Sequence, residues 1–595
     1  MREGGPNDLF VATYNGVLRS NLFLEVQFSR QQFEFLDAGG TDPDILASPF
    51  IDPATGGVYN APYFDATDPE DRNNRQVTGS LSYFLSTESL GRHDLKVGYE
   101  SFRNTRTGGN SQSASDFVFY TDYLRDVEGA PVQDGTQLVP VFTPFSSFIL
   151  NWQAERGGRL DITTNSFFVN DRWTLNDHWS FNVGVRYEKV RSEATGGIVG
   201  IDTDTIVPRL AASFDVRGDG RFRLDATYAH YAGGYNTALF SNNTNVGRPS
   251  LVYGIYAGPA GEGEAFAPGF DPANYITVGG FFPTANVRFE DGLSSPVTRE
   301  WTLAGGVQWG AGRYAKLAYV NRRIRDFVED LILFENGSTV VMEDGEPLLE
   351  LTNTVFQNSN LPIRDYRGLQ LQAGERITDA WRVEGHYTLQ LANEGNYEGE
   401  EGASIFPSAV GDFPEIFVAD RNYPLGRLRA FQRHKARVWT NYDLGLGRFG
   451  RVNLGLLWRY NSALGYSLAA ANVNLSDVQA ARDPGYADTP PTQTLFFGER
   501  GREDYRGAHL FDLAVNYEIP VWRSLRPWAK FEAFNLFNND TLTRFNTTIE
   551  PDYDGPIDAD GLPTTFTRDA RFGQATSQNS YPVPRTLQFS VGFRF

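Results

Sequence analysis

The chain of 595 residues contains no cysteine and few histidines. Without cysteine it has no disulfide framework, no zinc ribbon and no thiol chemistry. The histidines lack the spacing of metal ligands, so we expect neither a zinc nor a haem site. They are His93, His178, His230, His386, His434 and His509. Basic residues are also in deficit, with 53 Lys and Arg against 73 Asp and Glu, a formal net charge of −20. This balance argues against nucleic acid as a partner, because phosphate binding needs clustered Lys and Arg.

Long apolar segments and enzyme motifs are missing as well. No run approaches the roughly 18 consecutive apolar residues of a membrane helix. Residues 1–18 lack the basic start and apolar stretch of a secretory signal, so we expect no signal peptide in this chain. There is no nucleophile elbow, no phosphate-cradling glycine loop and no HExxH helix. We therefore predict neither an enzyme nor a bound cofactor.

The sequence is rich instead in glycine, proline and aromatic residues, and its last nine residues show how these are used. It has 60 Gly, 31 Pro and 14% aromatic residues, which is typical of strands and turns. In LQFSVGFRF, apolar side chains alternate with polar or small ones: Leu587, Phe589, Val591, Phe593 and Phe595 against Gln588, Ser590, Gly592 and Arg594. Because side chains of a strand alternate between its faces, one face is apolar and the other polar. Such a strand suits a wall between lipid and water.

The same alternation recurs along the chain. One example is the alternation of Trp179, Phe181, Val183, Val185 and Tyr187 with Ser180, Asn182, Gly184, Arg186 and Glu188. A lipid-facing apolar side, a polar lumenal side and aromatics near strand ends predict an all-β fold, a transmembrane antiparallel β-barrel. We predict about 17 strands. They lie near 8–18, 21–36, 72–88, 92–107, 160–174, 177–193, 205–216, 220–232, 297–309, 312–326, 365–376, 379–391, 431–445, 450–463, 506–519, 526–539 and 584–595.

The connections between these strands are of two kinds. Short turns are expected near 15–21, 89–93, 176–178, 217–220, 310–312, 378–379, 445–450 and 520–527. Between the resulting hairpins lie segments of roughly 30 to 65 residues rich in Gly, Pro, Asn and Asp. Loops of that length are unusual in a compact soluble domain. Outer-membrane barrels combine short periplasmic turns with long extracellular loops, and we assign the two kinds accordingly.

An odd number of strands affects how the barrel closes. With short turns in the periplasm, the first and last predicted strands both run toward the periplasm, so an antiparallel barrel needs at least one further ascending strand between them. Together with the missing signal, this predicts a single barrel domain over residues 1–595 that lacks its N-terminal part. The alternative is an uncounted element in Pro140–Ala154, which contains the apolar run Phe148–Leu150.

Four segments resemble the C-terminal barrel of TonB-dependent receptors, most closely the Oar-like group. They are Asn165–Tyr187 (NSFFVNDRWTLNDHWSFNVGVRY), Val207–Phe214 (VPRLAASF), Phe531–Asn539 (FEAFNLFNN) and Pro584–Phe595 (PRTLQFSVGFRF). The resemblance extends over most of the chain. It implies a barrel of the 22-stranded type, of which this chain would hold about 17 or 18 strands, with a plug in the lumen. Against this pattern, we expect the plug domain, the TonB box and the first barrel strands to be absent from this sequence.

The resemblance also implies a function and partners. In this family extracellular loops capture a scarce polar ligand, and TonB, driven by the inner-membrane proton gradient, pulls the plug to admit it. Phe589, Phe593 and Phe595 resemble the signal read by the barrel assembly machinery. The implied location is the bacterial outer membrane, and the implied partners are its lipid and lipopolysaccharide, that machinery, TonB, a plug domain and an extracellular ligand. Two alternatives are a passive porin-like channel and an adhesin or structural outer-membrane protein that acts through its loops.

Charged residues on the polar faces of the strands are the candidates for function in the lumen. The basic ones are Arg186, Arg223, Arg437, Arg459 and Arg594, and the acidic ones are Asp94, Glu100, Asp225, Asp512 and Glu518. They can hold a plug through charge pairs and pass a polar substrate. The alternative is that they pair with one another, as charges in any wet barrel interior do.

Two predicted loops carry many acidic residues and no Lys or Arg. Segment 37–71 has Asp37, Asp42, Asp44, Asp52, Asp65, Asp68, Glu70 and Asp71, and segment 392–420 has Glu394, Glu398, Glu400, Glu401, Asp412, Glu415 and Asp420. These loops can capture a cationic or metal-bearing ligand, or bridge divalent ions near lipopolysaccharide. The alternative is that they solvate exposed loops and resist aggregation.

Two further loop segments are candidates for ligand binding. Asp552, Asp554, Asp558 and Asp560 have spacings that hard cations favour. Pro556 and Pro563, however, stand where an EF-hand has ligands, so an Asp- and Gly-rich turn is the alternative to a calcium site. The loop Tyr231–Pro296 is rich in aromatic residues, among them Tyr235, Phe240, Tyr256 and Phe270. These can form a ligand platform or pack against one another.

Overall fold

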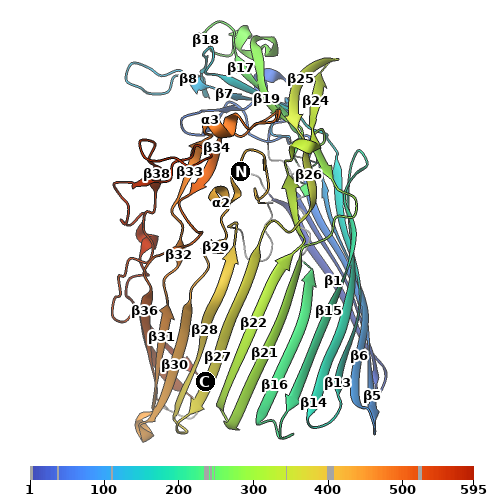
Figure 1. Ribbon diagram of the computed structural model, residues 1–595, viewed down its shortest axis with the longest axis vertical. Coiled ribbons are helices and arrows are strands. Elements are labelled where there is room, and N and C mark those ends of the chain that lie inside the picture. Colours follow the sequence, from blue (N-terminus) through green and yellow to red (C-terminus); the bar gives the residue numbers. More distant parts are fainter. Residues whose placement is uncertain are drawn as a thin grey trace.

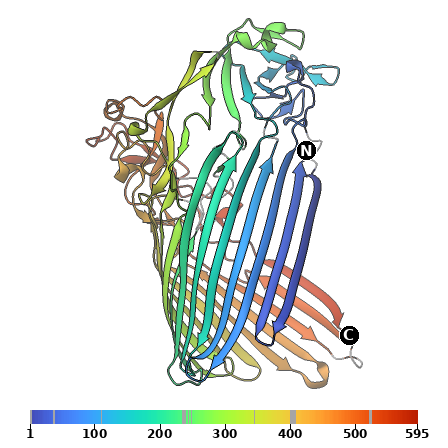
Figure 2. The same cartoon turned by 90° about the vertical axis from the view of Figure 1, so that its right-hand side faces the viewer.

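The computed structural model describes residues 4–35, 39–108, 111–232, 240–241, 244, 246, 248–343, 345–398, 408–519, 521 and 525–594. Their main element is an 18-stranded sheet that forms a tall, curved wall of tilted strands (Figure 1). One member, β29 (Gly426–Arg427), is 2 residues long, so 17 of the 18 described strands span the wall. Short turns line the lower rim and folded loops rise above the upper rim (Figure 2).

The long strands follow one another around the wall in chain order, and each pairs antiparallel with its neighbours. They are β1 (Gly4–Arg19), β2 (Leu22–Phe35), β5 (Glu70–Thr87), β6 (Gly91–Thr107), β13 (Arg159–Thr174), β14 (Trp179–Ala194), β15 (Ile198–Asp215), β16 (Phe222–Ala232), β21 (Val297–Gly310), β22 (Arg313–Arg325), β27 (Arg364–Arg376), β28 (Trp381–Gly395), β30 (His434–Gly445), β31 (Arg451–Asn461), β36 (Ala508–Glu518), β37 (Arg526–Phe534) and β40 (Thr586–Arg594). The all-β fold, its antiparallel sheet and the predicted strand positions are confirmed. The differences lie at the strand ends, chiefly the earlier start of β15 and the earlier end of β37.

The first and last strands form the two edges of the wall. Among the described residues no pairing joins β1 to β40. Successive strands alternate in direction, so these two edges, separated by an even number of steps, both run toward the lower rim. The sheet therefore has the odd number of wall-spanning strands that the sequence predicts.

The two faces of the wall differ as the sequence predicts. On the outer face of β40, Phe589 is 70% exposed and Val591 is 68% exposed. On β14 the outer residues Val183 and Val185 are also exposed, whereas Arg186 lies on the lumenal face. Large contiguous apolar surfaces are rare on soluble proteins. Here they recur from strand to strand, which fits contact with hydrocarbon.

The lower turns are short because local side chains and glycines close them. Between β15 and β16, the Asp215 carboxylate accepts the backbone N–H groups of Gly218 at 2.9 Å and Gly220 at 2.5 Å. Gly218 and Gly220 have φ angles of 69° and 79°, a left-handed conformation that glycine adopts without steric cost. The Asp and Gly of this turn thus reverse the chain within a few residues.

Three upper loops fold together into a small domain that we call the cap. Its 6-stranded sheet has the order β19-β17-β12-β7-β3-β4. These strands are β3 (Phe50–Ile51), β4 (Val58–Tyr59), β7 (Phe117–Tyr120), β12 (Phe148–Gln153), β17 (Ser250–Tyr256) and β19 (Tyr275–Phe281). The suspected element in Pro140–Ala154 therefore exists as β12, but it belongs to the cap and adds no strand to the wall.

The remaining elements of the loops and turns are short. The strands are β8 (Asp122–Tyr123), β9 (Gln133–Asp134), β10 (Gln137–Leu138), β11 (Pro140–Phe142), β18 (Gly261–Glu262), β20 (Val287–Phe289), β23 (Phe327–Leu331), β24 (Ser338–Glu343), β25 (Glu346–Thr352), β26 (Thr354–Ser359), β32 (Gly465–Tyr466), β33 (Ala469–Asn474), β34 (Thr492–Phe496), β35 (Glu503–Asp504), β38 (Ile549–Pro551) and β39 (Phe566–Arg568). The α-helical turns are α2 (Ala419–Asn422) and α3 (Asp477–Ala480), and 3-10 turns occur at Ile45–Ala47, Ala267–Phe270, Pro272–Asn274, Phe334–Asn336, Gly447–Phe449 and Gln578–Ser580. In the described part of the chain, none of the helices has the length and apolarity needed to cross a bilayer.

Candidate functional site

The lumenal face of the wall carries charges that pair across and along the strands. The ion pairs among the predicted residues are Arg186–Glu100 at 2.9 Å, Arg223–Asp225 at 3.0 Å, Arg459–Asp512 at 2.8 Å and Arg594–Glu518 at 3.1 Å. The first pair reaches from β14 over β13 to β6, and Ser166 of β13 also accepts a hydrogen bond from Arg186 at 2.8 Å. Neighbouring strands are thus linked from the inside. The part of these residues in binding a plug or a substrate stays a prediction.

Two of the predicted lumenal residues differ from these simple pairs: in the part of the chain that the structure describes, one makes no ion pair with the predicted acidic residues, and the other has more than one basic partner. Arg437 of β30 donates to the carbonyl oxygens of Ala436 and Tyr460 and, at 2.8 Å, to the side chain of Asn461. Glu518 is only 7% exposed and lies 3.5 Å from Arg526 and 3.9 Å from Arg451, besides its pair with Arg594. One carboxylate therefore collects three guanidinium groups beside the last strand of the wall.

A cavity of about 1050 Å³ lies against the lumenal face of β16, β21, β22 and β27. Its charged lining includes Arg223, Asp225, Glu300, Lys316, Arg322 and Arg364. Lys316 lies 3.2 Å from Asp225, and Arg322 lies 2.6 Å from Glu300. Of these six residues, only Arg223 and Asp225 are among the lumenal charges predicted from the sequence. Glu300, Lys316 and Arg322 occupy alternate positions of predicted strands, and this alternation was the signal that could have identified them.

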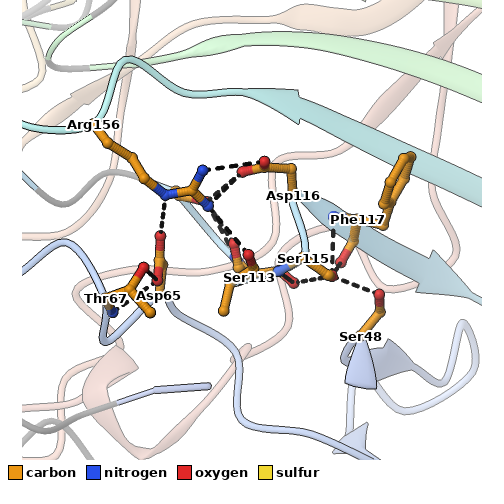
Figure 3. A network of polar contacts seen from close by, with 10 residues as sticks. Ser48, Asp65, Thr67, Ser113, Ser115, Asp116, Phe117 and Arg156 are labelled. Carbon is orange, nitrogen blue, oxygen red and sulfur yellow. Dashed lines mark hydrogen bonds and ion pairs between the residues drawn. The ribbon is translucent and has the colours of Figure 1, made fainter. Parts of the chain in front are cut away.

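Several carboxylates of the acidic loop 37–71 form contacts that stabilise the cap. Asp65 is 6% exposed and accepts hydrogen bonds from the backbone of Thr67 at 2.8 Å and from Arg156 at 2.9 Å. Arg156 belongs to the loop between β6 and β13 and also donates to Asp116 of that loop at 2.8 Å. Figure 3 shows Arg156 between the two carboxylates. In the same network Ser48 and Ser115 are joined by a 2.6 Å hydrogen bond.

Two further carboxylates of this loop are also withdrawn from solvent, whereas Asp42 and Asp44 are exposed. Asp52 is 1% exposed, Glu70 is 2% exposed, and Glu70 lies 2.5 Å from Arg72. Neither ligand capture nor solvation of an exposed loop describes these buried groups, because they serve as internal anchors. Asp37 lies outside the described residues.

The second acidic loop contains a cluster that the sequence did not reveal. Asp412 is 8% exposed, and one of its carboxylate oxygens has no hydrogen-bond partner among the described residues. It lies near Asp330 and Glu329 of β23, in the preceding loop. Glu329 is 2% exposed and accepts two hydrogen bonds from Ser408, at 2.8 Å from the backbone and 2.7 Å from the hydroxyl. Glu400 and Glu401 lie outside the described residues.

Burial changes the acidity of this cluster. Loss of solvation raises the pKa of Glu329 to about 8, that of Asp412 to about 7 and that of Asp330 to about 6. The hydrogen bonds from Ser408 oppose this rise for Glu329, but they do not cancel it. Two upper loops therefore meet at carboxyl groups that change charge near neutral pH.

Three of the four aspartates considered as calcium ligands have side-chain contacts within the loops, and the fourth, Asp554, is exposed. Asp558 pairs with Arg421 of α2, and Asp560 lies 2.5 Å from Arg482. Asp552 accepts hydrogen bonds from the hydroxyl of Thr565 at 3.1 Å and from the backbone of Asp554 at 3.2 Å. Within the ranges that the structure describes, no group of three or more His, Asp or Glu side chains is arranged to hold a metal ion. Calcium binding by these aspartates stays a prediction.

The aromatic residues of the loop Tyr231–Pro296 that are buried pack against other loops. Tyr256 and Phe240 are 0% exposed and Phe270 is 5% exposed. Phe270 contacts Phe142 with ring centroids 5.2 Å apart, inside the cap. Mutual packing thus accounts for these rings, whereas Tyr235 lies outside the described residues.

Two of the three residues that resemble an assembly signal lie on the last strand. Phe589 and Phe593 point to the outer face of β40 and are 70% and 67% exposed. Phe595 lies outside the described residues. Recognition of this strand by an assembly machinery stays a prediction.

Comparison with known proteins gives a consistent result. Residues 13–539 match a family model described as "TonB dependent receptor-like, beta-barrel". The chain is similar to the TonB-dependent transporter Oar of Myxococcus xanthus, with 21% identity over 609 residues that cover 91% of this chain and 52% of Oar. It therefore spans about half the length of this curated relative.

Solved structures share the fold at low sequence identity. One is the outer membrane transporter YddB of Escherichia coli, with 13% identity and a TM-score of 0.55, covering 99% of this chain and 63% of that one. Another is the siderophore receptor PirA of Acinetobacter baumannii, with 10% identity and a TM-score of 0.51, covering 99% of this chain and 62% of that one. At these identities the likeness concerns the fold alone.

Proposed function

The chain belongs to the family of TonB-dependent receptor-like β-barrels, whose members are outer-membrane transporters and not enzymes, and we propose that it forms the wall through which a receptor takes up a scarce polar ligand. The single observation that carries this proposal is the wet lumenal face, with a cavity of about 1050 Å³ lined by paired charges. An apolar solute would have to strip water from those charges, which is costly. A polar ligand can exchange water for them.

The wall requires partners to work in this way. A plug domain would seal the lumen, and TonB would displace it. The parallel directions of β1 and β40 support at least one more strand in the closed cylinder, because one strand antiparallel to both edges would complete an all-antiparallel ladder. The exposed apolar row of β40, which includes Phe589 and Phe593, supports contact with the assembly machinery and with membrane lipid.

A passive porin-like channel is the main competing function, and conductance separates the two. We expect the full-length receptor in a planar bilayer to be closed, and the chain described here, refolded without a plug, to conduct ions or to leave the bilayer leaky. A full-length protein that conducts continuously without TonB would contradict the proposal and favour a channel.

The folded cap gives the adhesin alternative a specific basis, since it presents its own sheet and aromatic core above the wall. A binding assay with the purified TonB periplasmic domain distinguishes this case. Uptake requires the full-length protein to bind that domain, whereas an adhesin has no use for it.

A further inference from the structure

Four arginines lie in one line across the outer face of neighbouring strands, near the upper rim. Arg30 of β2 faces Arg75 of β5, and Arg75 faces Arg103 of β6. Arg103 faces Thr163 of β13, which in turn faces Arg191 of β14. We call Arg30, Arg75, Arg103 and Arg191 the arginine row. All four side chains are exposed.

The row belongs to the lipid-facing side of the wall. Below Arg30 on the same face of β2 come Phe28, Val26 and Leu24, because side chains alternate along the strand. The guanidinium of Arg75 lies 5.5 Å from the centre of the Phe28 ring, which places both side chains on one face. The residues at alternate positions of these strands face the lumen. One of them is Gln76 of β5, which donates a hydrogen bond to Glu100 at 2.6 Å.

The height of the row matches the surface of a bilayer. Arg75 and Arg103 lie twelve residues from the ends of β5 and β6 at the lower turn, Thr87 and Gly91. At about 3.3 Å per residue and a tilt of roughly 40°, this places them about 30 Å above the lower rim. The apolar band of a membrane barrel is about 25 Å tall, so the row lies just beyond the hydrocarbon of the upper leaflet.

The row is a positively charged region on a chain whose net charge is negative. The protein as a whole carries −20. Among the described residues, however, Arg30 and Arg75 form no ion pair. Arg103 shares one carboxylate, Asp161 at 2.7 Å, with Arg159, also at 2.7 Å. Arg191 is paired with Asp202 at 2.8 Å and lies 3.6 Å from Glu193. The excess of positive charge therefore lies with Arg30, Arg75 and Arg103, at the level of the lipid headgroups.

We propose that the arginine row binds the phosphate groups of a phosphorylated glycolipid of the outer leaflet, the lipid A part of lipopolysaccharide. Guanidinium groups bind phosphate oxygens in pairs of parallel hydrogen bonds. The acyl chains then lie along the apolar residues below the row, such as Phe28 and Val77. This inference rests on the proposed function only in requiring that the wall spans an outer membrane with the short turns in the periplasm.

Another part of the wall provides a matched control. Arg299 of β21 and Arg323 of β22 also face each other on the outer side. Each has an acidic neighbour, Asp326 at 3.5 Å from Arg299 and Asp365 at 3.7 Å from Arg323. These arginines share the chemistry and the exposure of the row, but each has a carboxylate beside it, of which Asp365 also lies 3.2 Å from Arg325.

The test measures binding of fluorescent diphosphoryl lipid A and of its dephosphorylated form to the detergent-solubilised full chain. We compare the triple variant Arg30→Gln, Arg75→Gln, Arg103→Gln with the control Arg299→Gln, Arg323→Gln. Since each basic residue near an anionic lipid surface contributes about fivefold, the triple variant should lose at least about tenfold in affinity. The control should stay within about twofold, and wild type should prefer the phosphorylated lipid at least about tenfold.

Three results would overturn the inference: unchanged affinity in the triple variant, an equal loss in the control, or equal binding of both lipids by wild type. The comparison of the two lipids uses wild type alone and so does not depend on the folding of any variant. A chain that is folded and dispersed without detergent would defeat the proposed function itself. Unchanged lipid A binding by a barrel that requires detergent defeats only this inference.

Discussion

Single residues in this protein illustrate how position in the fold decides the role of a charge. Asp65, Asp412 and Arg186 all come from segments that the sequence marks as charged, yet only Arg186 faces the lumen. Alternation along a strand predicted the orientation of Arg186 correctly. No comparable rule exists for loops, so the burial of Asp65 and Asp412 could not be predicted from their sequence.

The buried carboxyl cluster leads to a prediction of pH dependence. A carboxyl group whose pKa is higher in the folded protein than in the open loop opposes the folded packing when it ionises. The contact between Glu329 and Ser408 should therefore be most stable below about pH 4 and weaken as the pH rises through about 8, the pKa of Glu329. Hydrogen exchange at the amides of Phe413 and Ile416, corrected for its intrinsic pH dependence, should accelerate about tenfold or more between pH 5 and pH 9.

The variant Glu329→Gln should flatten the upper part of this dependence, because the amide oxygen still accepts from Ser408 but carries no charge. Glu335→Gln, at an exposed position in the same loop, is the control and should leave the profile unchanged. A profile that is identical in wild type and Glu329→Gln would show that another group is responsible.

At the scale of elements, the strands were predictable and the loops were not. Each long strand repeats its pattern of period two over nine residues or more, which is enough to fix both its position and its faces. The cap strands are shorter, and β3 and β4 have 2 residues each, too few for any periodicity. Their pairing depends on contacts between three loops far apart in sequence, which local patterns do not encode.

The cap leads to a prediction at this scale. Arg156 joins two of its loops through Asp65 and Asp116, and the side chain of Asp65 is 0% exposed. Replacing Arg156 by Met leaves a buried carboxylate without its cation, which should cost the cap about 2 kcal/mol. Hydrogen exchange in residues 39–69 should rise accordingly, while exchange in the wall stays unchanged.

Arg125 provides the control for this experiment, since it lies in the same region but reaches Asp52 only at 4.0 Å and Asp122 at 3.4 Å. We expect Arg125→Met to have a small effect. If both variants loosened the cap equally, the network around Asp65 would not be what holds it.

At the scale of the whole molecule, the fold class was predictable because one pattern repeats in every strand of the wall. The existence of a lumen follows from that pattern, but the shape of its cavity does not. Lys316 and Asp225 come from strands that are distant in sequence, and only the order of pairing brings them to 3.2 Å. The net charge of the outer rim likewise depends on which strands are neighbours.

The central claim is that one face of the wall touches hydrocarbon and the other touches water, and a cysteine scan tests it most directly. Because the chain has no cysteine, single substitutions can be introduced along 512–516 of β36 without any background reaction. In proteoliposomes, a membrane-impermeant thiol reagent should label positions 512, 514 and 516 and spare positions 513 and 515. Uniform labelling, or alternation of the opposite phase, would contradict the account.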